Sequence, residues 1–399
     1  MLIVKKFGGS SVKDVYHINK VADKVIQDYN KGNDVVVVLS AMGDTTDDLI
    51  AMAKEVNPKP SRREMDMLLT TGEQISVSML AMAIQKRRIP AISLNSFQVG
   101  IFTTSDFSQA RLKNINDQRI RNEIESGKIV IITGFQGINR SNDYTTLGRG
   151  GSDTTAVALA AALRADKCEI YTDVDGVYTA DPRIVSDAVK LEEISYDEML
   201  EMASLGAKVL HNRSVEMAKK YGVRLIVRSS LNDVEGTVVK ENTEVEKMLI
   251  KGVTCDKNVA KISVVGLKDE PGIAFKMFDA LAKNKINVDV IIQSIGQNGV
   301  KNISFSVDEE SLDIALEVLK NKDYGIEYSS LVYDTNVAKV SIVGAGMMTH
   351  EGVAAAMFEA LYNANININM ITTSEIKITV LIDKNEADRA VKAIHEKFI

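Results

Sequence analysis

The sequence predicts an α/β protein in which a mainly parallel sheet is followed by two smaller βαββαβ units. The first observation is an alternation of short β-rich runs with helical stretches up to about residue 230. The second is that several runs are continuously apolar, as in Val35–Leu39, which is typical of strands covered on both faces. The third is an internal repeat in the C-terminal part.

Strands and helices are expected to alternate in the N-terminal part. The expected strands are Leu2–Phe7, Asp34–Ser40, Ala91–Leu94, Lys128–Phe135, Cys168–Thr172 and Arg224–Val227. The expected helices include Val12–Tyr29, Arg62–Gln85, Asn116–Glu125 and Thr154–Arg164. Ligands of such sheets bind at the carboxyl ends of the strands, so the loops that follow the strands are the place to look for a site.

Composition narrows the class of protein. The chain has 399 residues, of which 45% are hydrophobic and 26% charged, as in a multidomain globular protein. The net charge of −6, without blocks of like charge, argues against nucleic acid or a membrane as the main partner. From the sequence we expect neither a signal peptide at the N-terminus nor an apolar stretch approaching the ~20 residues of a spanning helix. We expect a soluble cytoplasmic protein with Cys168 buried in its core.

The C-terminal part repeats itself. Ala260–Gly266 recurs as Ala338–Gly344, Phe278–Leu281 as Phe358–Leu361, and Ile286–Val288 as Ile366–Ile368. Each copy is predicted to contain strand, helix, strand, strand and helix, and needs one further strand to complete a βαββαβ sandwich. Met248–Cys255 and Tyr328–Tyr333 are available as these strands.

These patterns predict four parts of the chain: 1–231 as the α/β domain, 232–246 as a linker, 247–335 as the first repeat and 336–399 as the second. A strand from 247–257 would complete the second repeat. Simple structural duplication explains the shared core positions. It explains less well the divergent loops Lys268–Gly272 and Met347–Gly352.

The stretch Thr145–Asp153 has the strongest functional pattern. Three glycines surround Arg149, and Ser152 and Asp153 follow at once before an alanine-rich helix. An arginine on a backbone of so little bulk can bind an anion bidentately. The glycines let main-chain amides approach the same ligand, and the helix N-terminus adds positive potential. The turn is therefore predicted to hold a small anion.

The first strand ends in a second anion pattern, Lys6–Ser11. A lysine, two glycines and a helix N-terminus can form a phosphate cradle, although Lys6 precedes the glycines, unlike the lysine of a Walker motif. A phosphate site and a tight connection are equally compatible with this turn. Lys5 must point to the opposite face of the strand, so only one of the two lysines can reach the cradle.

Other polar residues allow two interpretations each. Ser40–Thr46 suits a ligand wall or a helix cap. Glu73, taken alone, is better explained as a solvated surface carboxylate. In the loop after Thr172, Tyr178 could lie against a base or pack in the core, and Arg183 could meet phosphate or form a surface ion pair. His211 is interpreted as structural, because no nucleophile or metal ligand accompanies it.

Taken together, Lys6–Ser11, Thr71–Glu73, Thr145–Asp153, Thr172–Arg183 and the tandem repeats resemble the aspartokinases. The resemblance runs over essentially the whole chain, with the motifs in the family's order. It implies the amino acid kinase fold, a three-layer sandwich around a mainly parallel sheet, followed by two ferredoxin-like ACT regulatory domains. Because the sequence ends after the second repeat, the form expected is the monofunctional one, without a homoserine dehydrogenase half.

The resemblance also implies an activity, transfer of the γ-phosphoryl group of MgATP to the β-carboxylate of L-aspartate. This reaction is the first step toward lysine, threonine and methionine. A carboxylate with a pKa of about 3.9 is already ionised at neutral pH, so no general base is required. Magnesium would be carried by phosphate oxygens and water, without a dedicated metal site in the protein.

The family's pattern implies roles for individual residues. Lys6 and Asp153 would act at the transferring phosphoryl group. Aspartate would be bound by Ser40, Thr46, Glu73, Arg149 and Ser152. ATP would be bound by Lys6, Phe7, Gly8, Gly9, Thr172, Asp173, Tyr178, Thr179, Ala180, Asp181, Pro182, Arg183 and Lys208.

The repeats imply feedback control by an end-product amino acid, lysine in the first place and threonine as a second effector. The implied contacts are Asp289, Gln293 and Ser294 in the first copy, and Met347, His350, Glu351 and Val353 in the second. Only the first copy keeps an Asp-x-Pro-Gly turn, which leaves open whether both copies bind a ligand. Pairing of repeats between chains would give a homodimer or a dimer of dimers.

Two alternatives stay open. Another kinase of the same fold, acting on N-acetylglutamate, glutamate or uridylate, is the nearest rival. A non-catalytic amino-acid sensor is the second. A Glu73 contact to a free α-amino group and the tandem repeats favour aspartokinase over the first, and the intact Lys6, Arg149 and Asp153 argue against the second.

Overall fold

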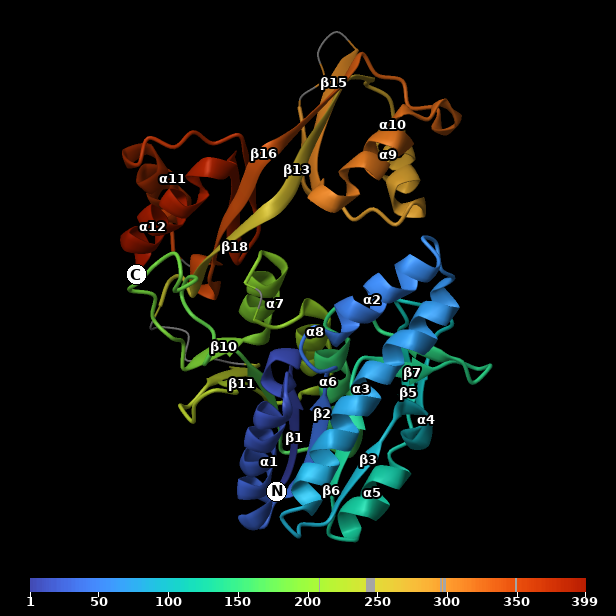
Figure 1. The fold of residues 1–399 in the computed structure, drawn as a ribbon. Coiled ribbons are helices and arrows are strands. Elements are labelled where there is room, and N and C mark those ends of the chain that lie inside the picture. The colour runs from blue at the N-terminus through green and yellow to red at the C-terminus, as the bar shows by residue number, and fades with distance from the viewer. Residues whose placement is uncertain (208, 242–247, 295, 297–298, 349) are drawn as a thin grey trace. The chain divides into compact units, whose positions relative to one another are not determined.

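The computed structural model describes residues 1–207, 209–241, 248–294, 296, 299–348 and 350–399 (Figure 1). The chain forms two compact units. The first contains Met1–Val177, Lys190–Ser204 and a later stretch that includes the strand Thr237–Lys240. The second contains Tyr178–Val189, Leu205–Ala207 and the C-terminal part ending at Ile399. The short segment Tyr178–Val189 therefore folds with the C-terminal part, although it lies within the N-terminal half of the sequence.

An eight-stranded sheet forms the centre of the first unit, in the order β10-β12-β11-β9-β1-β2-β6-β3. Only β11 and β12 pair antiparallel, so the sheet is mainly parallel, as predicted. The strands are β1 (Leu2–Phe7), β2 (Asp34–Leu39), β3 (Ala91–Leu94), β6 (Ile129–Thr133), β9 (Lys167–Thr172), β10 (Glu193–Ser195), β11 (Leu225–Ser229) and β12 (Thr237–Lys240).

Helices cover both faces of this sheet and make the three layers expected of the fold (Figure 1). On one face, α1 (Val15–Asn30) and α3 (Arg62–Gln85) pack on apolar side chains such as Val35 and Val37. On the other face, α6 (Gly151–Leu163) packs on β1, β2 and β9 and against α8 (Asn212–Tyr221). Because strand side chains alternate between faces, Lys5 points toward α1 and Lys6 toward α6.

A second sheet of four short strands was not predicted from the sequence. Its order is β5-β4-β7-β8, with β4 (Ile101–Thr103), β5 (Leu112–Ile115), β7 (Gln136–Ile138) and β8 (Tyr144–Thr146). Strands of three or four residues carry too little alternation to be detected as strands. The remaining helices of this unit are α2 (Thr45–Val56), α4 (Ser96–Val99), α5 (Gln118–Glu125) and α7 (Tyr196–Ser204).

Two helix starts differ from the sequence prediction. Helix α1 begins at Val15 instead of Val12, because Asp14 caps it by accepting the amide of His17 and Gly9–Val12 forms a 3₁₀ turn. Helix α6 begins at Gly151 instead of Thr154, directly after the left-handed Gly150. Ser152 and Asp153 therefore belong to the first helical turn.

The C-terminal part contains a six-stranded sheet in the order β14-β15-β13-β16-β18-β17. Two long antiparallel strands, β13 (Gly252–Lys268) and β16 (Ser330–Val343), run through both repeats. Val253 pairs with Ile342 and Ile262 pairs with Tyr333, so each strand pairs with the other inside both copies. The other strands are β14 (Asp289–Gln293), β15 (Val300–Asp308), β17 (Met370–Thr373) and β18 (Lys377–Asp383).

Each repeat has its own apolar core beneath two helices. The first copy packs α9 (Ile273–Lys283) and α10 (Leu312–Lys320) around residues such as Ile262 and Phe305. The second packs α11 (Val353–Asn363) and α12 (Ala387–Phe398) around Ile342 and Val380. This second core also includes Ala180 and Val185.

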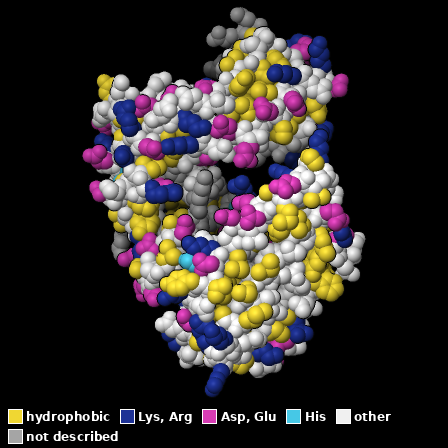
Figure 2. Space-filling view, viewed as in Figure 1, with side chains coloured by type: hydrophobic (Ala, Val, Ile, Leu, Met, Phe, Trp, Pro, Cys, Tyr) yellow, Lys and Arg dark blue, Asp and Glu magenta, His cyan; other side chains and the backbone are white. Residues whose placement is uncertain are grey.

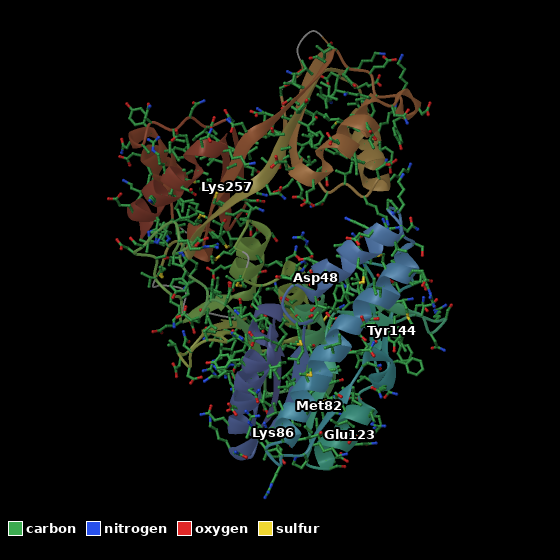
Figure 3. The ribbon with its side chains drawn as sticks, viewed as in Figure 1. Asp48, Met82, Lys86, Glu123, Tyr144 and Lys257 are labelled. Atoms are coloured by element: carbon green, nitrogen blue, oxygen red, sulfur yellow. The ribbon has the colours of Figure 1, made fainter. Side chains whose placement is uncertain are left out.

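Helix α3 is long and apolar enough to cross a membrane by length and composition alone, which the sequence analysis did not expect. Half of its apolar window is buried inside the protein, as in the core helix of a globular domain. Met82 of this helix is exposed, as is Lys86, which directly follows the helix; both are labelled in Figure 3. On the face drawn in Figure 2, basic and acidic side chains are interspersed.

Candidate active site

A cavity of about 570 Å³ lies where β1, β2 and β6 end, within the first unit. Parallel register places Phe7 beside Leu39 and Leu39 beside Thr133, so the loops that follow these three strands meet. The cavity is lined by Lys6, Gly9, Ser40, Ala41, Gly43, Thr46, Asp47, Ile50, Leu69, Glu73, Ser108, Phe135, Thr146, Gly148, Arg149, Gly150, Gly151, Ser152 and Asp153. All seven residues named for aspartate binding or catalysis from the sequence line this one cavity.

Lys6 forms an ion pair with Asp153, with 2.6 Å between Nζ and Oδ1. Both side chains are largely buried, at 12% and 13% exposure, so the pair has little solvent screening. Lys5 lies on the opposite face, where its ammonium group contacts Glu169 at 3.0 Å and also Asp28. The prediction that only one of the two lysines reaches the cavity is confirmed.

Glu73 is buried inside α3, with 3% of its surface exposed, so its interpretation as a solvated surface carboxylate is wrong. One carboxylate oxygen, Oε1, accepts the Ala41 amide at 3.2 Å, and the other, Oε2, has no hydrogen-bond partner among the described residues. Burial raises the pKa of Glu73 to about 8. Gly72 allows this close packing, since a Cβ there would come within 2.9 Å of the Ala41 Cβ.

The Arg149 turn depends on two left-handed glycines. Gly148 has φ +76° and Gly150 φ +67°, a region that side chains of L-residues rarely adopt. At Gly150 a Cβ would also come within 2.2 Å of the His211 ring. His211 caps α8 by accepting the Arg213 amide, which fits the structural role predicted for it. Arg149 itself is exposed at the cavity, and no carboxylate of the described residues forms an ion pair with it.

The N-terminus of α6 faces the same cavity through Gly151, Ser152 and Asp153. No side chain caps this helix of 13 residues, although the Gly151 amide donates to the Gly148 carbonyl at 3.0 Å. The positive end of the helix dipole is therefore directed toward the cavity without a side-chain acceptor on it. Ser152 lies against Gly134, where a Cβ would come within 2.6 Å of its hydroxyl. Gly134 thus lets the end of β6 approach the helix closely.

Ser40 and Thr46 also line the cavity. The sequence left open whether Thr45 and Thr46 cap a helix or contact a ligand, and the structure gives the two residues different surroundings. Thr45 satisfies its hydroxyl locally by donating to the Met42 carbonyl at 2.5 Å, whereas Thr46 lines the cavity.

The residues predicted to bind ATP fall into two groups. Thr172 ends β9 and Asp173 follows it in the first unit, and the Thr172 hydroxyl donates to the Asp173 carboxylate at 2.8 Å. Phe7 is buried in the sheet and stacks on Tyr171, while Gly8 and Gly9 follow β1. Tyr178, Thr179, Ala180, Asp181, Pro182 and Arg183 belong to the second unit. Lys208 lies outside the described residues.

In the second unit, the segment that follows Tyr178 is hydrogen-bonded to the second repeat. The Val253 amide donates to the Thr179 carbonyl at 2.7 Å, and the Thr179 hydroxyl lies 2.9 Å from Nε2 of His395. Arg183 forms an ion pair with Asp181 at 2.7 Å, which is one of the two interpretations that the sequence allowed.

The predicted effector contacts are spread over both repeats. Asp289 begins β14 and forms an ion pair of 2.7 Å with Lys339 of β16. Gln293 ends β14 and Ser294 follows it, with both side chains exposed. Near the start of α11, Nδ1 of His350 donates to the Gly346 carbonyl at 2.9 Å, and Val353 is buried. Met347 is half-buried and Glu351 is exposed.

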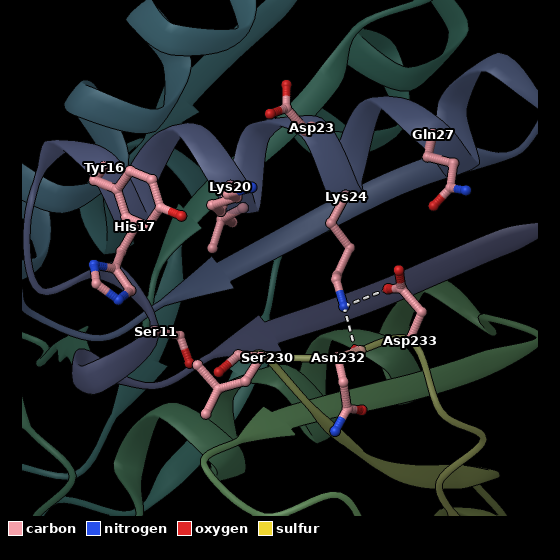
Figure 4. A pocket seen from close by; sticks show the side chains of 12 residues that line it. Ser11, Tyr16, His17, Lys20, Asp23, Lys24, Gln27, Ser230, Asn232 and Asp233 are labelled. Atoms are coloured by element: carbon pink, nitrogen blue, oxygen red, sulfur yellow. Dashed lines mark hydrogen bonds and ion pairs between the residues drawn. The ribbon is translucent and has the colours of Figure 1, made fainter.

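A second cavity of similar volume lies between α1 and the chain after β11, also in the first unit (Figure 4). Its charged groups are largely paired, since Lys24 bonds to Asp233 and to the Asn232 carbonyl at 2.8 Å each. The residues predicted to act on substrate line the first cavity instead, so that cavity is the candidate active site.

Sequence reasoning missed three cavity residues of chemical interest: Asp47, Ser108 and Phe135. Phe135 carried a usable signal, because it follows β6 at the carboxyl edge of the sheet. Ser108 carried no such signal, since it lies in an irregular loop far from the predicted motifs in sequence.

The sheet and the cavity together define a phosphotransferase of the amino acid kinase class. The family model "Amino acid kinase family" matches residues 1–229, and an ACT domain model matches residues 262–322 and 340–398. The chain is 50% identical to the aspartokinase of Bacillus sp. (strain MGA3), with 100% of this chain and 97% of that protein covered. It is 49% identical to the aspartokinase of Corynebacterium glutamicum, with 100% and 96% covered.

Solved structures agree with these sequence relatives. E. coli aspartokinase III in complex with aspartate and ADP (R-state) is 27% identical, with a TM-score of 0.85 and coverage of 100% and 99% of the two chains. The same enzyme in complex with lysine and aspartate (T-state) is 26% identical, with a TM-score of 0.77 and the same coverage. The chain belongs to the aspartokinases.

Proposed function

We propose that this aspartokinase binds L-aspartate in the β1/β2/β6 cavity and transfers the γ-phosphoryl group of ATP to its β-carboxylate. One observation carries the proposal. Within the part of the chain that the structure describes, the same cavity has a buried carboxylate oxygen without a partner, on Glu73, and a guanidinium without a paired carboxylate, on Arg149. These two groups complement a small zwitterion that bears one ammonium group and two carboxylates.

Glu73 is assigned to the α-ammonium group of aspartate. An empty site keeps this carboxyl protonated up to a pH of about 8, because burial disfavours its ionised form. An ammonium group in contact with Oε2 reverses that preference and forms a charge-assisted hydrogen bond. A substrate without an amino group leaves Oε2 without a partner.

Arg149 is assigned to a carboxylate of aspartate, with Ser40, Thr46 and Ser152 as further polar contacts. Its five donors in a planar fork match a carboxylate bidentately. The N-terminus of α6 adds amides and positive potential for the same negative charge.

The chemical step requires no general base, because the β-carboxylate is already ionised at neutral pH. One of its oxygens forms a bond to the γ-phosphorus while the bond from that phosphorus to the β–γ bridging oxygen breaks. The products are 4-phospho-L-aspartate and ADP. Lys6 offsets the negative charge that the two anions bring together, and Asp153 orients its ammonium group.

The phosphates of ATP are assigned to Lys6 and to the backbone of Gly8 and Gly9. A Cβ at Gly9 would come within 2.9 Å of the Ala41 carbonyl oxygen, so bare backbone is needed at this position. Thr172, Asp173, Tyr178–Arg183 and Lys208 are assigned to the nucleotide by family resemblance. Asp153, which forms the ion pair with Lys6, would orient that lysine or a magnesium ion carried by the phosphates, and such an ion would supply charge neutralisation.

Regulation is assigned to the C-terminal repeats, with lysine as effector and threonine as the second candidate. The E. coli relative in complex with lysine supports lysine. A homodimer or a dimer of dimers formed through the ACT domains, and a cytoplasmic location, complete this proposal.

Hydroxylamine trapping of the acyl phosphate tests the proposed function. With MgATP, we expect hydroxamate from L-aspartate and none above background from N-acetyl-L-glutamate or L-glutamate, and no nucleotide turnover with uridine monophosphate. Succinate, which is aspartate without its amino group, tests the Glu73 assignment and should react at least tenfold more slowly. Absence of aspartate-dependent hydroxamate would refute the proposed substrate, and equal rates with succinate would refute the role of Glu73.

A further inference from the structure

Asp66 lies on α3, outside the cavity, yet four donors that surround it come from the cavity wall. It is fully buried. Its Oδ2 accepts the amides of Ser108 at 2.9 Å and Thr146 at 2.8 Å. Its Oδ1 accepts the hydroxyls of Ser108 at 3.3 Å and Thr146 at 2.9 Å. Ser108 and Thr146 both line the cavity, and Thr146 lies three residues before Arg149 in the sequence.

Arg213, on α8, binds the same two stretches of backbone through their carbonyl groups. Its Nη1 donates to the Leu147 carbonyl at 2.9 Å and its Nη2 to the Ala110 carbonyl at 3.1 Å. The two stretches are also joined directly, by the Ala110 amide donating to the Thr146 carbonyl at 2.9 Å. The Asp66 carboxylate therefore accepts hydrogen bonds from both stretches, and the Arg213 guanidinium donates hydrogen bonds to both.

Asp66 and Glu73 are seven residues apart, two turns along α3, so they share one face of the helix. Along a helix this spacing corresponds to ~10.5 Å. Glu73 is the group assigned to the substrate ammonium, and Asp66 holds the turn that carries Arg149. One rigid helix thus fixes both ends of the aspartate pocket.

We propose that Asp66 and Arg213 are positioning residues that hold the Arg149 turn at a fixed separation from Glu73 and so set the affinity for aspartate. This inference rests on the proposed function, since it concerns binding of the same substrate. Neither residue contacts substrate in this assignment. Loss of either one lets the Arg149 turn move relative to α3, which weakens aspartate binding and leaves ATP binding intact.

The experiment compares KM for aspartate with KM for ATP in Asp66→Ala, Asp66→Asn and Arg213→Met. Asp66→Ala should raise KM for aspartate at least tenfold and change KM for ATP less than twofold. Asp66→Asn should stay within threefold of wild type, because its amide oxygen accepts both backbone amides and its NH₂ group faces two hydroxyls that can accept. Arg213→Met should raise KM for aspartate in the same selective way.

Glu198→Ala is the matched control. Glu198 is also buried in the first unit and accepts a backbone amide and a hydroxyl, both from Ser195, at 3.2 and 2.8 Å. It is not among the residues that line the cavity, so its loss should lower the melting temperature and leave both KM values unchanged. A parallel rise of both KM values in Asp66→Ala, or an Asn variant as impaired as the Ala variant, would overturn the positioning role.

Wild-type turnover separates this inference from the proposed function. A wild-type enzyme without aspartate-dependent turnover refutes the function itself. Wild-type turnover with an unchanged KM for aspartate in the Asp66 and Arg213 variants refutes only the positioning role. If Asp66→Ala does not fold, Arg213→Met decides, since a selective rise in KM for aspartate supports the inference and any other result overturns it.

Discussion

The Arg149 turn and the segment Tyr178–Val189 are both functional loops by family resemblance, but they belong to different cores. The Arg149 turn is held entirely within the first unit, by Asp66 of α3 and Arg213 of α8. The segment Tyr178–Val189 folds with the second unit, where Ala180 and Val185 join the apolar core of the second repeat. Chain position thus does not determine which core a functional loop belongs to.

This difference separates two kinds of control. Aspartate affinity is expected to depend on contacts inside the first unit alone. Part of the set assigned to the nucleotide, Tyr178–Arg183, belongs to the unit that contains the repeats, so changes in the repeats should affect ATP more than aspartate. Three predictions test this separation, beginning with the largest expected effect.

Lys6→Ala should lower kcat by about 10²–10³-fold, the range found when a preorganised charge or donor is removed from a reaction centre. KM for aspartate should change less than threefold, because Lys6 is assigned to the phosphoryl group. The exposed Lys86→Ala, on the same unit, is the control and should behave as wild type. Near-normal turnover in Lys6→Ala would contradict the assignment of Lys6 to the transferring phosphoryl group.

Glu73 should make aspartate binding depend on pH. Below pH of about 8 its carboxyl is protonated in the empty site, so kcat/KM for aspartate should fall as pH is lowered from 9 to 6. Glu73→Gln should flatten this profile and lower kcat/KM at pH 9 by about 10–100-fold, the equivalent of one charged hydrogen bond. KM for ATP should not follow the same profile, and a shared profile would contradict the separation.

The same group affects stability with a defined sign. The folded pKa of about 8 lies above the ordinary value of 4.5, so the folded state keeps a proton that the unfolded state releases. Stability is therefore lost as pH rises from about 4.5 to about 8. Glu73→Gln should remove that loss, and its melting temperature relative to wild type should increase over this window.

Thr179→Val should have the smallest effect and act on the nucleotide. The Thr179 hydroxyl accepts the Val189 amide at 2.9 Å and contacts His395, so its loss costs about 1 kcal/mol and should raise KM for ATP about fivefold. KM for aspartate should stay within twofold. Thr254→Val is the matched control, because the Thr254 hydroxyl is buried in the same unit without a partner among the described residues. A larger change in KM for aspartate than for ATP would contradict the separation.

The sequence by itself predicted the fold class, and with the family resemblance it named the seven residues for aspartate binding or catalysis that line the cavity. Continuous apolar runs predicted the parallel strands, and the repeat predicted two similar units. Lys6, Arg149 and Asp153 were found because glycine patterns and a helix start are local features of the chain. The sequence also predicted that Lys5 and Lys6 point to opposite faces, since that follows from strand geometry alone.

Only the tertiary structure decided the environment of each group. Burial of Glu73 depends on the close approach of Gly72 in α3 to Ala41, which follows β2. The hydrogen bonds of Asp66 depend on Ser108 in a loop and Thr146 in β8, both distant from it in sequence. The place of Tyr178–Val189 in the second core is likewise a product of long-range packing. Local patterns determine which chemistry a chain carries, whereas desolvation and partner choice arise from contacts between distant segments, which no local pattern encodes.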